Sequence, residues 1–408
     1  MDQPNFSGTY IGDDGVMRPS EVHAILERIV TCESVTGHEY DAGRLIAKIG
    51  CTHGLTVERQ PVAKRRENIL LTAGGDAWSA PHGLLLHGHY DTVPLLDMRD
   101  ALSARVRDNK MWGRGTVDQK GGLAAALAAA IAMTRLGRPF RRSLCVAAVV
   151  DEESEHRGSY ALAEQGIRAD YAFVTEPTNT VTAEFGCRGT TPIVIRVQGK
   201  TAHAGAPWMG VNAIEKAMPI LERLFQMPCP KVDLGVLGIV RGSLCVSMIE
   251  AGTAYNNVPN EAVIRMDRRT VPGEDSARAL AEVQAVLDQV HREDPSVVAT
   301  CEIARPDWHW APIRQRGLNP TLTPVDTPLA EILQSAAAAS GIGPIEPRFS
   351  NNYYDMDFLV NDLGIPTIVY GPGDGQLCHS AEEEVDLDDV CRVADVFCHV
   401  IERVCLEA

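Results

Sequence analysis

The sequence predicts an α/β protein with a largely parallel sheet, into which a smaller α+β domain is inserted. Three observations support this prediction. Short strands that are apolar along their whole length alternate with helices in the first and last parts of the chain, as in a parallel sheet buried on both faces. The middle part contains strands that alternate apolar and polar residues, as in a sheet with one exposed face. The length of 408 residues exceeds what a single core usually organises and favours two domains or more.

In the outer parts of the chain, the predicted strands are apolar runs bounded by polar or glycine residues. An amphipathic helix is expected over 19–32 and an alanine-rich, buried helix over 121–133. The predicted strands lie at 67–73, 82–89, 141–153, 170–177 and 365–373.

From about Gly189 the pattern changes to strand, helix, two strands, helix, strand. This order predicts a small, ferredoxin-like sheet with two helices on one face. The elements are expected at 190–199, 212–227, 243–252, 261–270, 274–293 and 296–304. After a loop the α/β pattern returns. The predicted boundaries are 1–189 for the first part of the larger domain, 190–308 for the inserted domain and 309–408 for the second part of the larger domain.

The composition excludes several classes of partner. A formal net charge of −16 argues against nucleic acid and anionic membranes, because both require a basic surface. The longest apolar run, 121–133, is too short to span a bilayer. The eleven cysteines show no CxxC spacing, which is typical of reduced thiols. Because the N-terminus also lacks a basic segment followed by an apolar run, we expect a cytoplasmic protein.

Acids and imidazoles follow four of the predicted strands at the point where each strand ends. In open α/β sheets, ligands bind in the crevice beyond the carboxyl ends of the strands. One more acid precedes the alanine-rich helix. Together these side chains are His87, His89, Asp91, Asp118, Asp151, Glu152, Glu153, Glu176 and His379. Each motif taken singly has an ordinary structural explanation, and for His87 we expect that explanation, a side chain packed beside the site. Their joint occurrence predicts a functional site.

So many carboxylates in one crevice would repel one another without a cation. Imidazole and carboxylate ligands together suit zinc, cobalt or manganese, whereas oxygen ligands alone would suit magnesium or calcium. Two such ions usually share a bridging carboxylate and a bridging water, whose pKa the metal lowers towards ~7. One further carboxylate is needed to carry the proton of this water to a leaving amine. We therefore predict two divalent metal ions, with zinc preferred over cobalt or manganese.

Seven motifs of the chain occur in the order found in the dinuclear-zinc peptidases and deacylases. The family includes acetylornithine deacetylase, succinyl-diaminopimelate desuccinylase, aminoacylase and the glutamate carboxypeptidases. The resemblance covers most of the chain, from about residue 20 to the end. The motifs are GHYDTVP, GRGTVDQKGG, DEESEHRGS, TEP, GKTAHAGAPWMGVNAI, NNVPNEAVIRMDRR and GPGDGQLCHSAEE.

The resemblance implies a place for each metal ligand. Asp118 corresponds to the bridging ligand. His89 and Glu176 correspond to the other ligands of one ion, and Glu153 and His379 correspond to those of the second. These five residues are our predicted metal ligands.

The resemblance also implies three catalytic roles. Glu152 corresponds to the general base that activates the water. Asp91 corresponds to the acid that orients His89 and tunes its basicity. His203, in GKTAHAG, corresponds to the histidine that reaches an active site and stabilises the tetrahedral oxyanion, often across a dimer.

Substrate contacts are implied in two further places. The inserted domain resembles the family's lid and dimerisation domain, so a homodimer is implied. Asn256 and Arg269 correspond to lid residues that contact the substrate carbonyl and carboxylate, and the neighbouring Arg268 could be mistaken for Arg269. The backbone N–H groups of Gly371 and Gly373 are expected to face the substrate.

The chain departs from the family's pattern at Asn351–Leu359. Many relatives carry Gly-Gly-Thr-Asp-Ala-Arg or a close variant there, whereas Asp357 stands where the arginine is common. An acid at this position cannot bind a substrate carboxylate. We therefore expect a substrate with a neutral or basic side chain, or a carboxylate that only the lid holds.

These observations predict a metal-dependent amidohydrolase that cleaves the amide bond of an N-acyl-amino acid, a deacetylase or deacylase using metal-activated water and Glu152. A carboxypeptidase or dipeptidase that acts on short peptides is the alternative within the family. A catalytically inactive, metal-binding regulatory relative is the alternative outside it. The intact set of metal positions and Glu152 argues against that second alternative, because an inactive relative need not keep the base.

Overall fold

The computed structural model describes residues 6–407, which form two compact units. The larger unit contains the described residues up to Gly186 together with 322–348 and 354–407. The smaller unit contains 187–321 and 349–353.

These limits differ from the predicted inserted domain, 190–308, mainly at its end. The segment after residue 308 stays with the smaller unit because hydrogen bonds tie it there. The N–H of Thr190 donates to the carbonyl of Leu318 (2.9 Å), and Nε of Arg314 donates to the carbonyl of Ile303 (3.3 Å).

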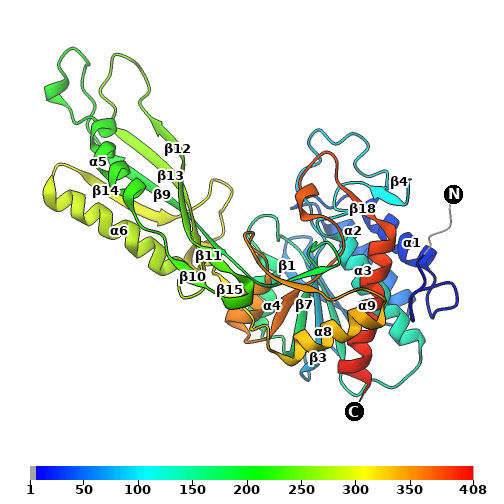
Figure 1. Cartoon of the computed structure of the whole chain (residues 1–408). Coiled ribbons are helices and arrows are strands. Elements are labelled where there is room, and N and C mark those ends of the chain that lie inside the picture. Colours follow the sequence, from blue (N-terminus) through cyan, green and yellow to red (C-terminus); the bar gives the residue numbers. More distant parts are fainter. Residues whose placement is uncertain (1–5, 408) are drawn as a thin grey trace. The chain divides into compact units, whose positions relative to one another are not determined.

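The larger unit is built on a nine-stranded sheet (Figure 1). Its order is β1 (Thr56–Ala63), β2 (Arg66–Ala73), β6 (Leu144–Val149), β3 (His82–His89), β7 (Ala169–Val174), β17 (Thr367–Val369), β8 (Thr182–Cys187) and β15 (Thr321–Leu322), with β16 (Glu346–Ser350) paired to β8. The inner strands β6, β3, β7 and β17 run parallel, while β1, β2 and β8 pair antiparallel with their neighbours. The predicted mostly parallel sheet is therefore confirmed for its inner strands.

The burial of each strand explains whether it could be predicted from the sequence. Every residue of β3 and β6 is buried, so these strands read as apolar runs. β1 was not predicted, because only one of its residues is buried and its sequence TVERQPVA is polar. The predicted strand over 141–153 is too long, since β6 ends at Val149 and the backbone turns at Asp151, whose φ is +73°.

The alanine-rich helix α3 (Lys120–Arg135) is buried from Lys120 to Met133 and contacts β3 and β6. It also packs against α1 (Pro19–Val30) and α9 (Leu387–Ile401) (Figure 1). Its first turn needs glycine because a Cβ on Gly121 would lie 2.4 Å from the carbonyl oxygen of Thr116, and one on Gly122 would lie 1.9 Å from that of Thr175. The unit also contains the helices α2 (Tyr40–Thr52), α4 (Arg157–Gln165) and α8 (Pro328–Ala339).

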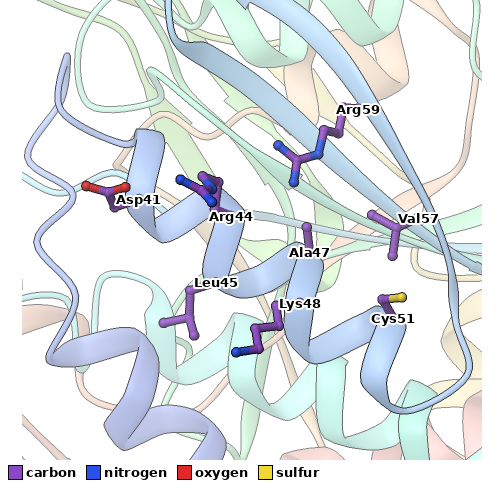
Figure 2. A pocket seen from close by; sticks show the side chains of 8 residues that line it. All are labelled: Asp41, Arg44, Leu45, Ala47, Lys48, Cys51, Val57 and Arg59. Atoms are coloured by element: carbon purple, nitrogen blue, oxygen red, sulfur yellow. The ribbon is translucent and has the colours of Figure 1, made fainter.

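A second, small sheet of the larger unit has the order β18 (Glu384–Asp386), β5 (Lys110–Trp112) and β4 (Arg105–Arg107). A surface groove of about 620 Å³ lies beside α2 and β1 and contains none of the predicted site residues (Figure 2). It is lined by Asp41, Arg44, Leu45, Ala47, Lys48, Cys51, Val57 and Arg59. None of the helices formed by residues 6–407 has the length and apolar character needed to cross a membrane.

The smaller unit has the predicted order of strand, helix, two strands, helix, strand. Its antiparallel sheet has the order β12 (Ser243–Ala251), β13 (Glu261–Thr270), β9 (Gly189–Gln198) and β14 (Val298–Ile303). The helices α5 (Ala213–Gln226) and α6 (Ser276–Glu293) contact each other and share one core with the sheet (Figure 1). A short hairpin of β10 (Lys231–Asp233) and β11 (Ile239–Arg241), and the helix α7 (Ala311–Arg316), were not predicted.

Candidate metal centre

Three adjacent parallel strands bring their carboxyl ends to one edge of the large sheet. β3 ends at His89, and β6 and β7 end a few residues before Glu153 and Glu176. In the strand registers, His89 pairs with Val149 of β6 and His87 pairs with Val174 of β7. The side chains that follow these strands are therefore neighbours in space, as the sequence predicts.

The five predicted metal ligands form two groups that share Asp118. In one group, His89 Nε2 lies 3.1 Å from Asp118 Oδ1 and 3.5 Å from Glu176 Oε1. In the other, His379 Nε2 lies 3.1 Å from Asp118 Oδ2 and 3.1 Å from Glu153 Oε2. Within each group, one atom per residue lies within 4.8 Å of the others. The two oxygens of Asp118 thus face different histidines, which is the arrangement required of a bridging carboxylate.

The charges of this cluster are not balanced by the protein alone. Burial, followed by the charge of Asp118, raises the pKa of Glu176 to about 7. Burial and Asp118 also raise the pKa of Glu153. Hydrogen bonds to Asp118 and Glu153 raise the pKa of His379 to about 10. Protons therefore occupy the cluster when no cation does, and divalent cations would replace them.

The donor atoms fit such cations. Oε1 of Glu153 is buried and has no hydrogen-bond partner, so the fold leaves a carboxylate oxygen available at this point. Each group offers one imidazole nitrogen and two carboxylates, a combination that suits zinc, cobalt or manganese. The remaining nitrogen of His89, Nδ1, contacts the backbone carbonyl of Asp91 (2.9 Å), which leaves Nε2 as the nitrogen for a metal.

Glu152 lies next to this cluster without belonging to either group. Its Oε2 is 3.9 Å from His89 Nε2, and its side chain is 13% exposed. Burial raises the pKa of Glu152 well above its ordinary value against the opposing charge of His89, and the charges of Asp355 and Glu176 add to the increase. Within residues 6–407 no hydrogen bond holds the Glu152 carboxylate. It is therefore available to exchange a proton with a small molecule.

The carboxylate of Asp91 lies beside His89, and against the effect of burial Asp118 and Asp91 both raise the pKa of that imidazole. The Asp91 carboxylate lies 3.6 Å from His89 Nδ1, beyond the carbonyl of the same residue. Its oxygens also accept the N–H groups of Glu152 (3.2 Å) and Glu153 (3.3 Å) and the hydroxyl of Thr36 (2.8 Å). Asp91 thus positions the backbone of the turn that carries the base and one predicted ligand, and it meets His89 with both its carbonyl and its carboxylate.

His87 is packed beside the site, as predicted. It is fully buried, and its Nε2 lies 2.7 Å from the hydroxyl of Ser159, which also donates to Asp355 Oδ2 (2.5 Å). Asp355 Oδ1 is 2.8 Å from Nδ1 of His156, and His156 Nδ1 is 4.0 Å from Glu152 Oε1. Our sequence reasoning missed His156 and Asp355. The only signal was their occurrence inside the motif DEESEHRGS and inside Asn351–Leu359, the segment that departs from the family's pattern.

The predicted lid residues lie in the smaller unit. His203 and Asn256 are exposed, and their segments are joined by the Ala204 N–H to Asn256 carbonyl hydrogen bond (2.9 Å). Arg269 is partly exposed, and its Nε donates to Asp267 (2.8 Å). The neighbouring Arg268 is fully buried and paired with Glu274, so Arg269 is the residue of the two that can meet a ligand.

The expectation for Gly371 needs correction. Its N–H donates to Oγ1 of Thr178 (3.2 Å), so it is not offered to a substrate. Gly371 is small because a Cβ there would lie 2.5 Å from the carbonyl oxygen of Thr175. Gly373 has a φ of +93°, a backbone conformation that favours glycine, and its carbonyl accepts the N–H of Asn179 (2.9 Å).

Asp357, at the position where relatives often carry arginine, faces the interior. It is fully buried, and its Oδ1 accepts Nδ2 of Asn361 (2.7 Å). The position therefore supplies no charged group for a substrate.

Comparison with known proteins gives matches over most of the chain. The family model described as Peptidase family M20/M25/M40 matches residues 85–403. Acetylornithine deacetylase of Myxococcus xanthus is 29% identical over 373 residues, which cover 86% of this chain and 89% of that protein. Succinyl-diaminopimelate desuccinylase of Stenotrophomonas maltophilia is 28% identical over 373 residues, with 87% and 93% covered.

A solved structure gives the same fold. The Bacillus subtilis YXEP protein, described as a dinuclear metal binding peptidase of the M20 family, superposes with a TM-score of 0.70 at 13% identity. The match covers 94% of this chain and 97% of that one. This likeness shows the fold, a mixed α/β structure with a mostly parallel central sheet.

Proposed function

The chain belongs to peptidase family M20/M25/M40, and from that premise we propose that it hydrolyses the amide bond of an N-acyl-amino acid. As a member of this family it is a metal-dependent hydrolase that acts on amides or peptides. The proposal of a deacylase rests on two relatives that match more than four fifths of this chain, a deacetylase and a desuccinylase. The single observation that carries the mechanism is the pair of histidine–carboxylate groups that share Asp118.

In this proposal the two groups hold a pair of divalent ions, zinc in preference to cobalt or manganese. His89 and Glu176 would bind one ion, Glu153 and His379 the other, and Asp118 both. When bound, the ions supply Lewis acidity to the substrate carbonyl and to a water molecule.

Glu152 moves the proton. As the carboxylate it takes a proton from the attacking water, and as the acid it delivers that proton to the leaving nitrogen. Burial raises the pKa of Glu152 well above its ordinary value, which makes its carboxylate a better proton acceptor than an exposed glutamate. The backbone N–H groups of Glu152 and Glu153 both donate to Asp91, which fixes the positions of the base and of one predicted ligand relative to each other.

The residues of the smaller unit are proposed to act on the substrate. His203 would donate to the oxyanion, Asn256 would contact the carbonyl, and Arg269 would bind the free carboxylate of the amino acid. Their support is exposure, which leaves each side chain accessible to a ligand. Gly373 would contribute backbone contacts, whereas Gly371 would only allow the chain to pass Thr175.

We also propose that the protein is a homodimer formed through the smaller unit. That unit exposes large apolar side chains, which are costly to leave in water and often mark an interface. They include Trp208, Met209, Met218, Phe225, Val236 and Tyr255. A cytoplasmic location completes the proposal, supported by cysteines that are all free thiols.

The test is metal removal followed by an acyl and peptide screen. Protein stripped with chelator and reloaded with zinc or cobalt should hydrolyse N-acetyl-ornithine, N-succinyl-diaminopimelate or other N-acyl-amino acids. Because Asp357 offers no cation to a second carboxylate, acetyl substrates should be preferred over succinyl substrates. Faster cleavage of dipeptides than of every N-acyl-amino acid would favour a peptidase instead.

The base is tested by Glu152→Gln with Glu155→Gln as its control. Glu155 lies in the same turn but is paired with Arg157. Glu152→Gln should lower kcat by about 10²–10⁴-fold while metal content stays unchanged. Equal activity in both variants would remove Glu152 from the mechanism.

A further inference from the structure

A buried ion pair joins the two loops that carry Asp118 and His379. Arg114 precedes Asp118 in one loop, and Glu383 follows His379 in the other. Arg114 Nη1 lies 2.6 Å from Glu383 Oε2, and the side chains are only 2% and 1% exposed. Neither residue belongs to the two histidine–carboxylate groups.

Each member of the pair also holds the main chain next to a predicted ligand. Glu383 Oε1 accepts the N–H groups of Val117 (3.0 Å) and of Asp118 itself (3.1 Å). Arg114 Nη1 donates to the carbonyl of Ser380 (3.1 Å), the residue after His379. The pair is therefore a direct link between the backbone of the shared acid and the backbone of one histidine.

Stabilisation of the folded state does not by itself explain why the chain has a buried ion pair here. The attraction between two buried charges is largely offset by the loss of their hydration, so apolar replacements are often as stable. What the pair provides is a fixed geometry. His379 Nε2 and Asp118 Oδ2 lie 3.1 Å apart although their residues come from loops more than 250 positions apart in sequence, and the pair spans the same two loops.

We propose that Arg114 and Glu383 are positioning residues that hold Asp118 and His379 at the separation a metal ion requires. This inference rests on the proposed dinuclear site. It assigns to the pair no contact with metal, water or substrate. Without the pair, the two loops can move apart in the metal-free protein. Metal binding should then be weaker, because Asp118 and His379 must first be brought back together.

The chain contains a matched control for this idea. Arg268 and Glu274 in the smaller unit form another buried pair, 2.5 Å apart, with side chains 0% and 3% exposed. Glu274 also accepts a backbone N–H, that of Val271 (3.0 Å). Substitutions of Glu274 thus remove the same kind of interaction without touching a predicted metal ligand.

The experiment compares Glu383→Ala and Glu383→Gln with Glu274→Ala and Glu274→Gln in the full-length, metal-free protein. Zinc affinity is measured by calorimetric titration, and coordination is followed by the visible absorption of the cobalt-loaded forms. We expect about 10–100-fold weaker zinc binding and an altered cobalt spectrum for the Glu383 variants. The Glu274 variants should lose stability in urea but keep both metal readouts. If Glu383→Ala does not fold, the Gln variant, which keeps an oxygen for the two N–H groups, decides the matter.

Wild-type affinity in the Glu383 variants would overturn the inference. Equal weakening in the Glu274 variants would also overturn it, because the effect would then follow from the loss of any buried pair. If the wild-type protein binds no pair of ions, the proposed function fails on its own. Hydrogen exchange in the metal-free protein then still tests the link, since the amides of Val117 and Asp118 should exchange faster in Glu383→Ala than in the wild type and the Glu274 variants.

Discussion

Gly122→Ala is expected to destabilise the protein and to weaken the metal site together. Gly122 lies in the first turn of α3, where a Cβ would sit 1.9 Å from the carbonyl oxygen of Thr175. Real Cβ contacts are essentially never shorter than 3.0 Å, so α3 and the end of β7 must separate by at least about 1.1 Å (3.0 − 1.9). Thr175 immediately precedes the predicted ligand Glu176.

Two opposing effects set the magnitude. Alanine is favoured over glycine inside a helix by about 0.5–1 kcal/mol. Overpacking a core costs about 1–3 kcal/mol, and the upper end applies because the obstacle is main chain between two buried elements. The net loss of unfolding free energy is therefore about 2–2.5 kcal/mol, the upper end of the overpacking cost less the helix preference of alanine. A 1 Å displacement of a functional group can lower a reaction rate on the order of 10²-fold. We therefore expect a loss of metal-dependent activity of about that size in addition to the loss of stability.

Gly50→Ala is the control. Gly50 lies in the helix α2, and a Cβ there would also sit 1.9 Å from its nearest neighbour, the methyl carbon Cδ2 of Leu71. A side-chain end can rotate away, so Gly50→Ala should change stability by less than about 1 kcal/mol in either direction. The assay is urea unfolding of the metal-free proteins, followed by zinc titration. Our reasoning is refuted if Gly122→Ala is as stable as Gly50→Ala, or if it binds zinc as tightly as wild type.

Three further predictions concern charge and catalysis. Asp118→Asn should bind at most one zinc ion per chain by elemental analysis, because the shared carboxylate serves both groups; two tightly bound ions would contradict its bridging role. Burial lowers the pKa of His87 to about 4 from 6.5, so the unfolded chain takes up this proton at higher pH than the folded chain does. The contribution of His87 to the unfolding free energy therefore falls by about 3 kcal/mol as pH drops from 6.5 to 4, and His87→Gln should flatten the pH dependence of urea unfolding by up to that amount. An unchanged slope would mean that His87 titrates normally. His203→Ala should lower kcat by about 10²–10³-fold with little change in metal content, whereas a loss confined to KM would assign His203 to ground-state binding.

Individual strands show which parts of the fold can be predicted from the sequence. β3 and β6 were predicted because each is buried along its whole length and therefore reads as a continuous apolar run. β1 was missed because it lies at the edge of the sheet, where polar residues and Pro61 are tolerated. The turn after β6 was extended as strand because the positive φ of Asp151 leaves no mark on the residue pattern.

The same contrast holds for the site. The amino-acid order was sufficient to place acids and histidines at the ends of adjacent strands, because parallel strands end at one edge of their sheet. It could not show that the Asp91 carboxylate accepts the backbone N–H of Glu152, or that Thr178 accepts the N–H of Gly371. It also could not show that Arg268 is buried while Arg269 is partly exposed. Nor could it reveal the link between Arg114 and Glu383. Local periodicity is a property of neighbouring residues and can be read along the chain. Hydrogen bonds between distant loops depend on how those loops meet in three dimensions, and only folding decides that.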